Sequence, residues 1–467
     1  MTDPNFFPFS PSDKSKWKSQ VEKDLKGKDF EKTLVSTVWG KIKQHPYYDS
    51  SDTSFLATAM DFHEPVEIPA LGPRHWTNAV EIFPSDSLSS NKEILNHLQN
   101  GADALVIHCQ ESMDWEKVLK NVLLEYIHIY ITPDSDKPES LFEFFDFIEK
   151  SGLPKEKLKG AILWSPADAL FENNSDWNKN LELAQKLIES SKDFPHFQAL
   201  TIKFARYANA GASGITETFL GLSELIELVD GLQNSGLSPK VIFENLAFHS
   251  CAGRDHFPEM VKLKSLRVLI PALGEKFGVT VSPSQIHLIV SSSLWTKSLI
   301  DQNNNFIRQT YEAISAILGG CNTLWIRPIE GENASTLSKR VARNISSILR
   351  EESHLDKVMD PTAGSYYIES LMKDFINSCI DEISKIEAEG GWLKAFQKRE
   401  IHKLVRAERE AIQKAIYENQ LSEVGVNRYL ASGKLINNLP FKPIPEKEFQ
   451  LLPSRESYLI EQETLQA

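Results

Sequence analysis

Several ionisable or amide side chains follow apolar runs that we expect to be strands. They are Lys203 in the run 199–204, Glu244 and Asn245 in the run 240–246, and Asp360 in the run 357–360. In a barrel of parallel strands, catalytic groups sit at the carboxyl ends of the strands. A desolvated Lys203 at such an end could form a Schiff base with a carbonyl substrate. The alternatives are a salt-bridged Lys203 at the barrel mouth and an Asp360 that caps the following turn.

The segment HSCAGRDH places His249, Cys251 and His256 close together in sequence. Their spacing matches no standard zinc pattern, and a polar loop after the fifth predicted strand explains them. The chain also contains no HExxH motif, no phosphate-binding loop and no G-x-G-x-x-G fingerprint. We therefore predict no metal site.

The elements that would position these residues alternate regularly from about residue 100. Short runs rich in β-branched and aromatic residues indicate buried strands. There are eight of them, at 104–109, 125–131, 160–165, 199–204, 240–246, 285–291, 322–328 and 357–360. Between them lie segments with apolar residues at three- and four-residue steps, which is typical of amphipathic helices. The pattern predicts an α/β fold, a (β/α)8 TIM barrel.

The stretch VMDPTAGSYYIESL (358–371) predicts the turn from the eighth strand into the last barrel helix. Pro361 has no N–H to give to a sheet, and Gly364 can adopt a backbone angle that other residues resist. Ser365 is the expected N-cap, and Glu369 lies early enough to favour the helix dipole.

Composition divides the chain into three parts. Residues 1–60 form an arm rich in Pro, Ser, Lys and aromatic residues, residues 61–375 form the barrel, and residues 376–467 form a helical tail. The aromatic residues of the arm are Phe6, Phe7, Phe9, Trp17, Trp39, Tyr47 and Tyr48. Such an arm packs either on its own domain or over a partner subunit, and the sequence leaves both open.

The bulk numbers exclude several classes of protein. The chain has 467 residues and a net charge of −13, so it lacks the basic surface that nucleic acid or anionic lipid requires. The N-terminus does not resemble a secretory signal, and no apolar run is long enough to span a membrane. The four cysteines, Cys109, Cys251, Cys321 and Cys379, form no C-x-x-C pair. Free thiols in the cytoplasm are the expectation.

Several segments, taken in order, resemble the methylmalonyl-CoA mutase family. They are NNNFIRQTYEAISAILGGCNTLWIRP, RVARNISSILREES, VMDPTAGSYYIESL and EVGVNRYL, with TVWGKIKQHPYY similar to the family's arm and NAGASGITE to its turn after the fourth strand. The resemblance covers nearly the whole chain. It implies a TIM barrel threaded by the substrate thioester and a separate C-terminal domain that brings adenosylcobalamin to its mouth. The cofactor supplies the radical chemistry that interconverts methylmalonyl-CoA and succinyl-CoA.

The chain departs from the family at the positions that carry chemistry. The cobalt-binding motif Asp-x-His-x-x-Gly is approached only by DFHEPV (61–66), which has Val66 for the glycine, and we expect too little chain after residue 430 for a cobalamin domain. Arg206 and Asn209 stand where the family has His and Glu. His287–Ser291 replaces Arg-Thr-His-Cys-Gln on the sixth strand, and ALGPRHWTNAVEI replaces the Tyr-Ala-Gly-Phe region.

The resemblance therefore implies the small, non-catalytic chain of a heterodimeric member of this family. The partner would be a large catalytic subunit that binds adenosylcobalamin, and the acyl-CoA substrates would be bound only through the complex. We expect no catalytic, cofactor-binding or metal-binding residue in this chain. Two alternatives stay open: a stand-alone, cobalamin-independent barrel enzyme acting through Lys203 or Glu244, and a subunit of a related acyl-CoA mutase.

Overall fold

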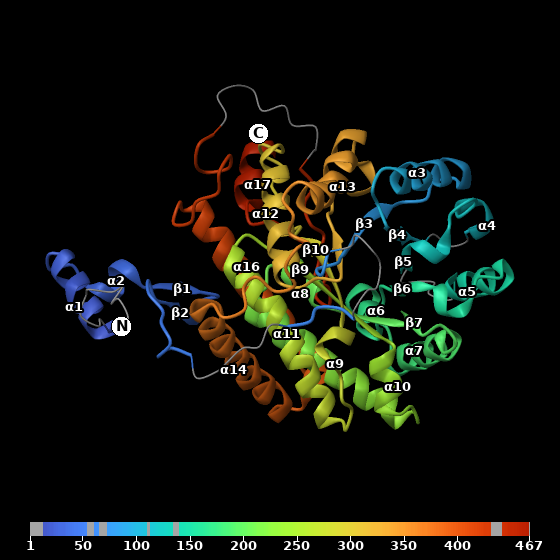
Figure 1. The fold of residues 1–467 in the computed structure, drawn as a ribbon, viewed down its shortest axis with the longest axis horizontal. Coiled ribbons are helices and arrows are strands. Elements are labelled where there is room, and N and C mark those ends of the chain that lie inside the picture. Colours follow the sequence, from blue (N-terminus) through green and yellow to red (C-terminus); the bar gives the residue numbers. More distant parts are fainter. Residues whose placement is uncertain are drawn as a thin grey trace, which may run out of the picture.

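The computed structural model describes residues 13–53, 60–64, 72–109, 113–133, 140–430 and 441–466. Its centre is a parallel sheet with the strand order β7-β6-β5-β4-β3-β11-β10-β9-β8 (Figure 1). The strands are β3 (Thr77–Ile82), β4 (Ala104–His108), β5 (His128–Thr132), β6 (Lys159–Ile162), β7 (His196–Gln198), β8 (Leu200–Lys203), β9 (Leu246–Ala252), β10 (His287–Ser292) and β11 (Thr323–Trp325).

The two edge strands of this sheet, β7 and β8, are consecutive in the chain and separated only by Ala199. They therefore share one position between β6 and β9, and the nine strands make a ring of eight positions. The N–H of Thr201 donates to the carbonyl of Trp164 at 2.9 Å and links β8 to the end of β6. The (β/α)8 barrel predicted from the sequence is confirmed.

Two of the eight predicted strands are wrong, and three strands of the sheet, β3, β7 and β9, were not predicted, since β9 shares only Leu246 with the run at 240–246. Residues 357–360 form no strand, whereas Thr77–Ile82 forms β3, the first strand of the barrel. The run at 240–246 is mostly helix α10 (Pro239–Glu244), and β9 begins only at Leu246. Proline suits the first position of a helix, and the Ser238 side chain accepts from the N–H of Val241, so α10 forms despite its β-branched residues.

Helices cover the outside of the ring. The long ones are α3 (Ser87–Gln99), α5 (Ser140–Ser151), α7 (Trp177–Ser191), α9 (Gly214–Asn234), α11 (His256–Lys276), α12 (Asn304–Leu318) and α13 (Thr336–Glu351). Shorter helices are α4 (Trp115–Val118), α6 (Pro166–Asn173) and α8 (Phe204–Asn209). The main apolar core lies between these helices and the sheet, as expected for strands buried on both faces.

The first segments of the chain stand away from the barrel (Figure 1). They are α1 (Lys14–Asp24), α2 (Phe30–Leu34), β1 (Ser36–Val38) and β2 (Ile42–Gln44). No side chain of α1 is buried. The arm is held at its base, where the Trp39 ring lies 4.7 Å from that of Phe375 and the Gln44 amide donates to the Tyr367 hydroxyl. Phe6, Phe7 and Phe9 lie outside the described residues.

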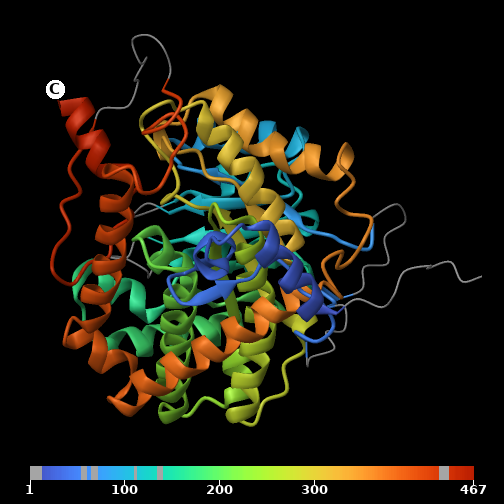
Figure 2. The ribbon, with the colours of Figure 1, turned by 90° about the vertical axis from the view of Figure 1, so that its left-hand side faces the viewer.

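The tail consists of α14 (Tyr366–Ala388), α15 (Gly391–Gln397), α16 (Glu400–Tyr417) and α17 (Tyr458–Gln466). Figure 2 shows the arm in front of the barrel, with α14 crossing below it. The start of α14 follows its sequence prediction: Gly364 has a φ of +81°, and the Ser365 side chain accepts from the N–H of Ile368. The Glu369 carboxylate turns back to accept from the N–H of Gly364 at 2.7 Å.

Candidate functional site

The carboxyl ends of the strands carry two networks of charged side chains. In the first, the Glu81 carboxylate at the end of β3 lies 2.8 Å from Nε2 of His108 on β4 and 3.4 Å from the guanidinium of Arg327, just after β11. Burial alone would raise the pKa of Glu81, but the charge of Arg327 and the contact with His108 outweigh burial and lower it. Glu81 is thus a charged anchor between neighbouring strands.

The second network contains Lys203, which ends β8 as predicted. Its Nζ lies 2.9 Å from the Asp168 carboxylate, and Arg206 contacts the same carboxylate at 2.8 Å. Arg206 also reaches Glu224 at 2.9 Å. Burial opposes ionisation of Asp168, but Lys203 and Arg206 overcome it and lower its pKa. This geometry matches the salt-bridged alternative for Lys203.

Glu244 and Asn245 lie at the opposite end of the barrel from the mouth, because they precede β9. The prediction that they end a strand is wrong. The Glu244 carboxylate is 3.8 Å from Lys240 on the exposed surface of α10. The amide oxygen of Asn245 accepts from the Ser191 hydroxyl at 2.9 Å.

Asp360 does not end a strand either, because residues 357–360 form none. It is buried against Lys264 of α11, whose Nζ donates to both carboxylate oxygens at 3.0 and 2.9 Å. The N–H and the hydroxyl of Thr362 donate to it at 3.2 and 2.9 Å. Asp360 therefore caps the turn before α14, which was the predicted alternative.

The segment containing His249, Cys251 and His256 is not a polar loop, because the first two residues lie within β9 and the third begins α11. His249 contacts the Ser291 hydroxyl at 3.0 Å, and His256 contacts that of Ser315 at 2.8 Å. Burial raises the pKa of the Cys251 thiol, so it stays protonated. In the described part of the chain, no group of three His, Cys, Asp or Glu residues could hold a metal ion.

Side chains fill the axis of the barrel. Tyr130 on β5 is fully buried, and its hydroxyl lies 2.8 Å from Nε2 of His287 on β10 and within hydrogen-bond distance of Thr323 on β11. In the ring, β5 and β10 stand on opposite sides, so the phenol crosses the lumen. Tyr130 belongs to an interior cluster with the buried apolar side chains of Ala79, Ala104, Val106, Ala161, Leu163, Ala247, Ile289 and Trp325.

The sequence profile of the methylmalonyl-CoA mutase family matches residues 101–451. The chain belongs to this family. The mutase profile thus covers the barrel from β4 onward together with most of the tail, in line with the motifs that resemble the family in the sequence.

Individual mutase relatives align over most of the chain. The methylmalonyl-CoA mutase small subunit of Porphyromonas gingivalis is 26% identical over 441 residues, which cover 91% of this chain and 71% of that one. The small subunit of Streptomyces virginiae is 26% identical over 80% of this chain and 62% of its own length. The human mitochondrial methylmalonyl-CoA mutase is 27% identical over 88% of this chain and 60% of its own length. The chain thus spans about 60 to 71% of the length of these relatives.

The residues that the sequence comparison found to differ from the mutase family pattern make structural contacts. Arg206 belongs to the ion-pair network with Asp168 and Glu224. The Asn209 amide oxygen accepts from the N–H of Leu294 at 2.8 Å. Of the segment on β10, Ile289 packs in the barrel interior and His287 bonds to Tyr130.

Sequence reasoning missed Glu81, His108, Arg327 and Tyr130. The signal for Tyr130 was present, because His128, Tyr130 and Thr132 alternate along β5 and residues two apart face the same side of a sheet. Polar residues at every second position of a buried strand indicate an inward polar face. Glu81 could not be placed because its strand was not recognised.

Proposed function

We propose that this chain is a non-catalytic, small-subunit member of the methylmalonyl-CoA mutase family. It would act in a heterodimer whose large subunit binds adenosylcobalamin and interconverts methylmalonyl-CoA and succinyl-CoA. The names of the Porphyromonas and Streptomyces relatives support a small-subunit role, although a complete mutase aligns at similar identity. The distinction therefore depends on the interior of the barrel.

The observation that carries the proposal is the Tyr130 side chain across the barrel axis. A substrate that threads a barrel needs a continuous lumen, and here a fully buried phenol bonds to the opposite wall. The neighbouring Trp325 and Ile289 are buried in the same interior cluster. Protein interiors are packed too densely for an acyl-CoA chain to pass such side chains without rearrangement.

The residue closest to the family's cobalt ligand does not fit that role. His63, in the segment closest to the cobalt-binding motif, has both ring nitrogens engaged: Nδ1 lies 2.8 Å from the carbonyl of Glu64, and Nε2 accepts from the N–H of His75 at 2.9 Å. No lone pair is left for a metal. We place the cofactor in the large subunit and derive no step through it in this chain.

The stand-alone alternative has little support from the geometry. Lys203 is held by Asp168, and Glu244 lies on the exposed surface at the other end of the barrel. A subunit of a related acyl-CoA mutase would have the same fold, and the names of the relatives favour methylmalonyl-CoA for the complex.

We further propose that the arm, residues 1–60, contacts the large subunit. Helix α1 buries none of its side chains on this chain, and Trp17 stacks on Tyr47 with ring centroids 4.8 Å apart.

The four cysteines are free and buried, which suits a reducing compartment such as the cytoplasm. Among the described residues, no helix is both long and apolar enough to cross a membrane.

The test is turnover with and without a partner. The purified chain, given adenosylcobalamin and methylmalonyl-CoA, should form no succinyl-CoA, and coexpression with a complete large subunit should yield a one-to-one complex that does. Lys203→Met should leave the turnover of that complex within about twofold, because Lys203 would have only a structural role. Turnover by the chain alone, or failure to bind any complete mutase chain, would overturn the proposal.

A further inference from the structure

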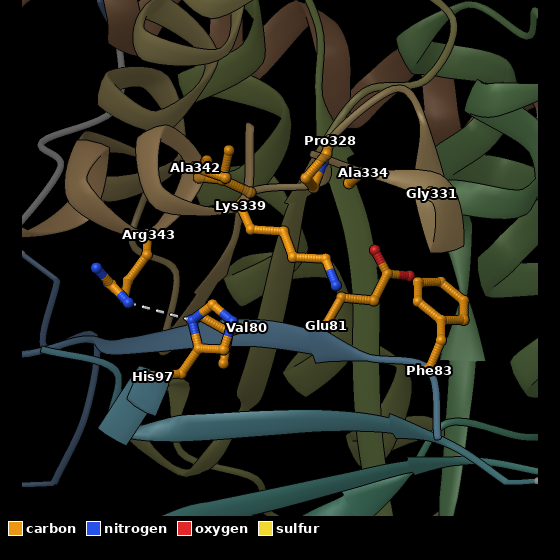
Figure 3. Close-up of a pocket in the computed structure, with 11 residues that line it drawn as sticks. Val80, Glu81, Phe83, His97, Pro328, Gly331, Ala334, Lys339, Ala342 and Arg343 are labelled. Carbon is orange, nitrogen blue, oxygen red and sulfur yellow. Dashed lines mark hydrogen bonds between the residues drawn. The ribbon is translucent and has the colours of Figure 1, made fainter. Parts of the chain in front are cut away.

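A pocket separate from the barrel axis opens between β3, the end of β11 and helix α13. Its lining includes Glu81, Phe83, His97, Lys339 and Arg343, and it is a small hollow open to solvent. In Figure 3, Arg343 and His97 lie at one end of this pocket, and the Lys339 side chain extends across it.

Arg343 is a buried cation without an anionic partner. Its exposed fraction is 8%, and Nε has no hydrogen-bond partner. The guanidinium contacts Nδ1 of His97 at 3.4 Å, and no carboxylate in the described part of the chain forms an ion pair with it. Burying a charge without a counter-charge is costly, so a site of this kind favours an anion from outside the chain.

The other charges around the pocket are already balanced. Lys339 lies 2.6 Å from Glu93, which also approaches His97 at 3.6 Å. Glu81 is paired with His108 and Arg327, as described above. One positive charge, that of Arg343, therefore remains uncompensated.

The position in the fold indicates which anion fits. The pocket lies beside the last strand of the barrel, and its lining includes Gly331 and Ala334, just before helix α13 begins at Thr336. Barrels of this class often bind phosphate near the loops of their last strands, at the N-terminus of a helix. An arginine fork also matches phosphate oxygens in geometry.

We propose that this pocket binds the phosphate group of a small phosphate monoester, with Arg343 as its main ligand. The site does not depend on the proposed subunit role, because it uses none of the residues on the barrel axis. Binding would supply the counter-charge that Arg343 lacks.

In the test, the full chain is titrated with inorganic phosphate at constant ionic strength. Binding is measured by calorimetry and by phosphorus NMR. Wild-type protein should show saturable binding at one site. Arg343→Gln should raise the Kd at least about tenfold, the effect of losing one charge-assisted hydrogen bond. Arg340→Gln is the matched control, since Arg340 is exposed on the same helix, and it should change the Kd by less than about twofold.

A second variant keeps the proposal testable if Arg343→Gln does not fold. Glu93→Gln would release Lys339 from its ion pair and remove a negative charge near the site, so phosphate should bind several-fold more tightly. Absence of phosphate binding to wild type, equal affinity in Arg343→Gln, or weaker binding in Glu93→Gln would overturn the proposal. Malonate that binds as tightly as phosphate would overturn the choice of ligand.

Discussion

Replacing Lys264 with methionine should destabilise the chain strongly, because the buried Asp360 carboxylate would lose its cation. The side chains of Lys264 and Asp360 are 3% and 0% exposed, and Lys264 Nζ also donates to the Thr362 hydroxyl at 2.8 Å. Removing one member of a buried pair costs about 3–5 kcal/mol. Asp360 would keep three donors: the Thr362 hydroxyl at 2.9 Å, the Thr362 N–H at 3.2 Å and the Met60 N–H at 3.3 Å. We therefore expect about 3 kcal/mol, the lower end of that range.

The measurement is urea denaturation near neutral pH for wild type, Lys264→Met, Asp360→Asn and the double variant. Each single variant leaves one buried group without its partner, whereas the double variant leaves neither charge. The two single costs should therefore exceed the cost of the double variant by about 2 kcal/mol or more. Lys117→Met is the control, because Lys117 and Asp114 form an exposed pair at 2.7 Å, and it should cost less than about 0.5 kcal/mol.

Two outcomes would refute this reasoning. One is a cost for Lys264→Met below about 1 kcal/mol, the range of an exposed ion pair. The other is strict additivity of the two single costs in the double variant, since residues in direct contact should couple. The comparison requires similar m-values, because a changed slope would mean that the unfolded state had changed too.

Three further predictions concern the strands. Tyr130→Phe should cost about 1–3 kcal/mol in urea denaturation, because it leaves His287 without its hydroxyl partner; an unchanged stability would contradict this contact. Burial lowers the pKa of His287 from 6.5 to about 4, so the unfolded chain binds its proton first and the native state loses stability as pH falls below 6.5. The stability advantage of wild type over His287→Asn should therefore shrink by about 1.5–2 kcal/mol between pH 6.5 and about pH 5, and a constant difference would contradict the shift. Gly160→Ala should cost at least about 2 kcal/mol in thermal or urea unfolding, because φ is +133° and the new Cβ would lie 1.8 Å from the carbonyl oxygen of Ile129. Gly152→Ala, at φ +71° with nothing within 4 Å, should cost less.

The fold could be predicted from the sequence because buried parallel strands leave a strong local pattern. Runs such as that of β4, with Ala104–Ile107 all buried, are continuous and apolar. The errors in the strand prediction arose where a local helix signal competed with the apolar pattern of a strand. Ser238 and Pro239 start a helix in a segment that otherwise has β-branched residues, and only the capping contact shows which preference prevails.

The candidate site was less predictable, because it depends on which side chains face each other across the ring. Arg206 and Asp168 are 38 residues apart, and their contact depends on the positions of β6 and β8. Lys203 could be placed at a strand end, but its partner could not be named. The position of Glu244 was predicted wrongly because strand β9 begins only at Leu246, after Glu244.

The Tyr130 bridge also bears on how such a chain could change over evolutionary time. Under the proposed role, substitutions that placed catalytic side chains at the barrel mouth would bring no benefit while the phenol blocked the path to them. The Tyr130 side chain would have to be replaced first. That substitution removes its buried contacts to His287 and Thr323 without an immediate gain in activity. If the chain has the non-catalytic role proposed above, a lineage with this bridge would be held in that role by the order in which the reversals would have to occur.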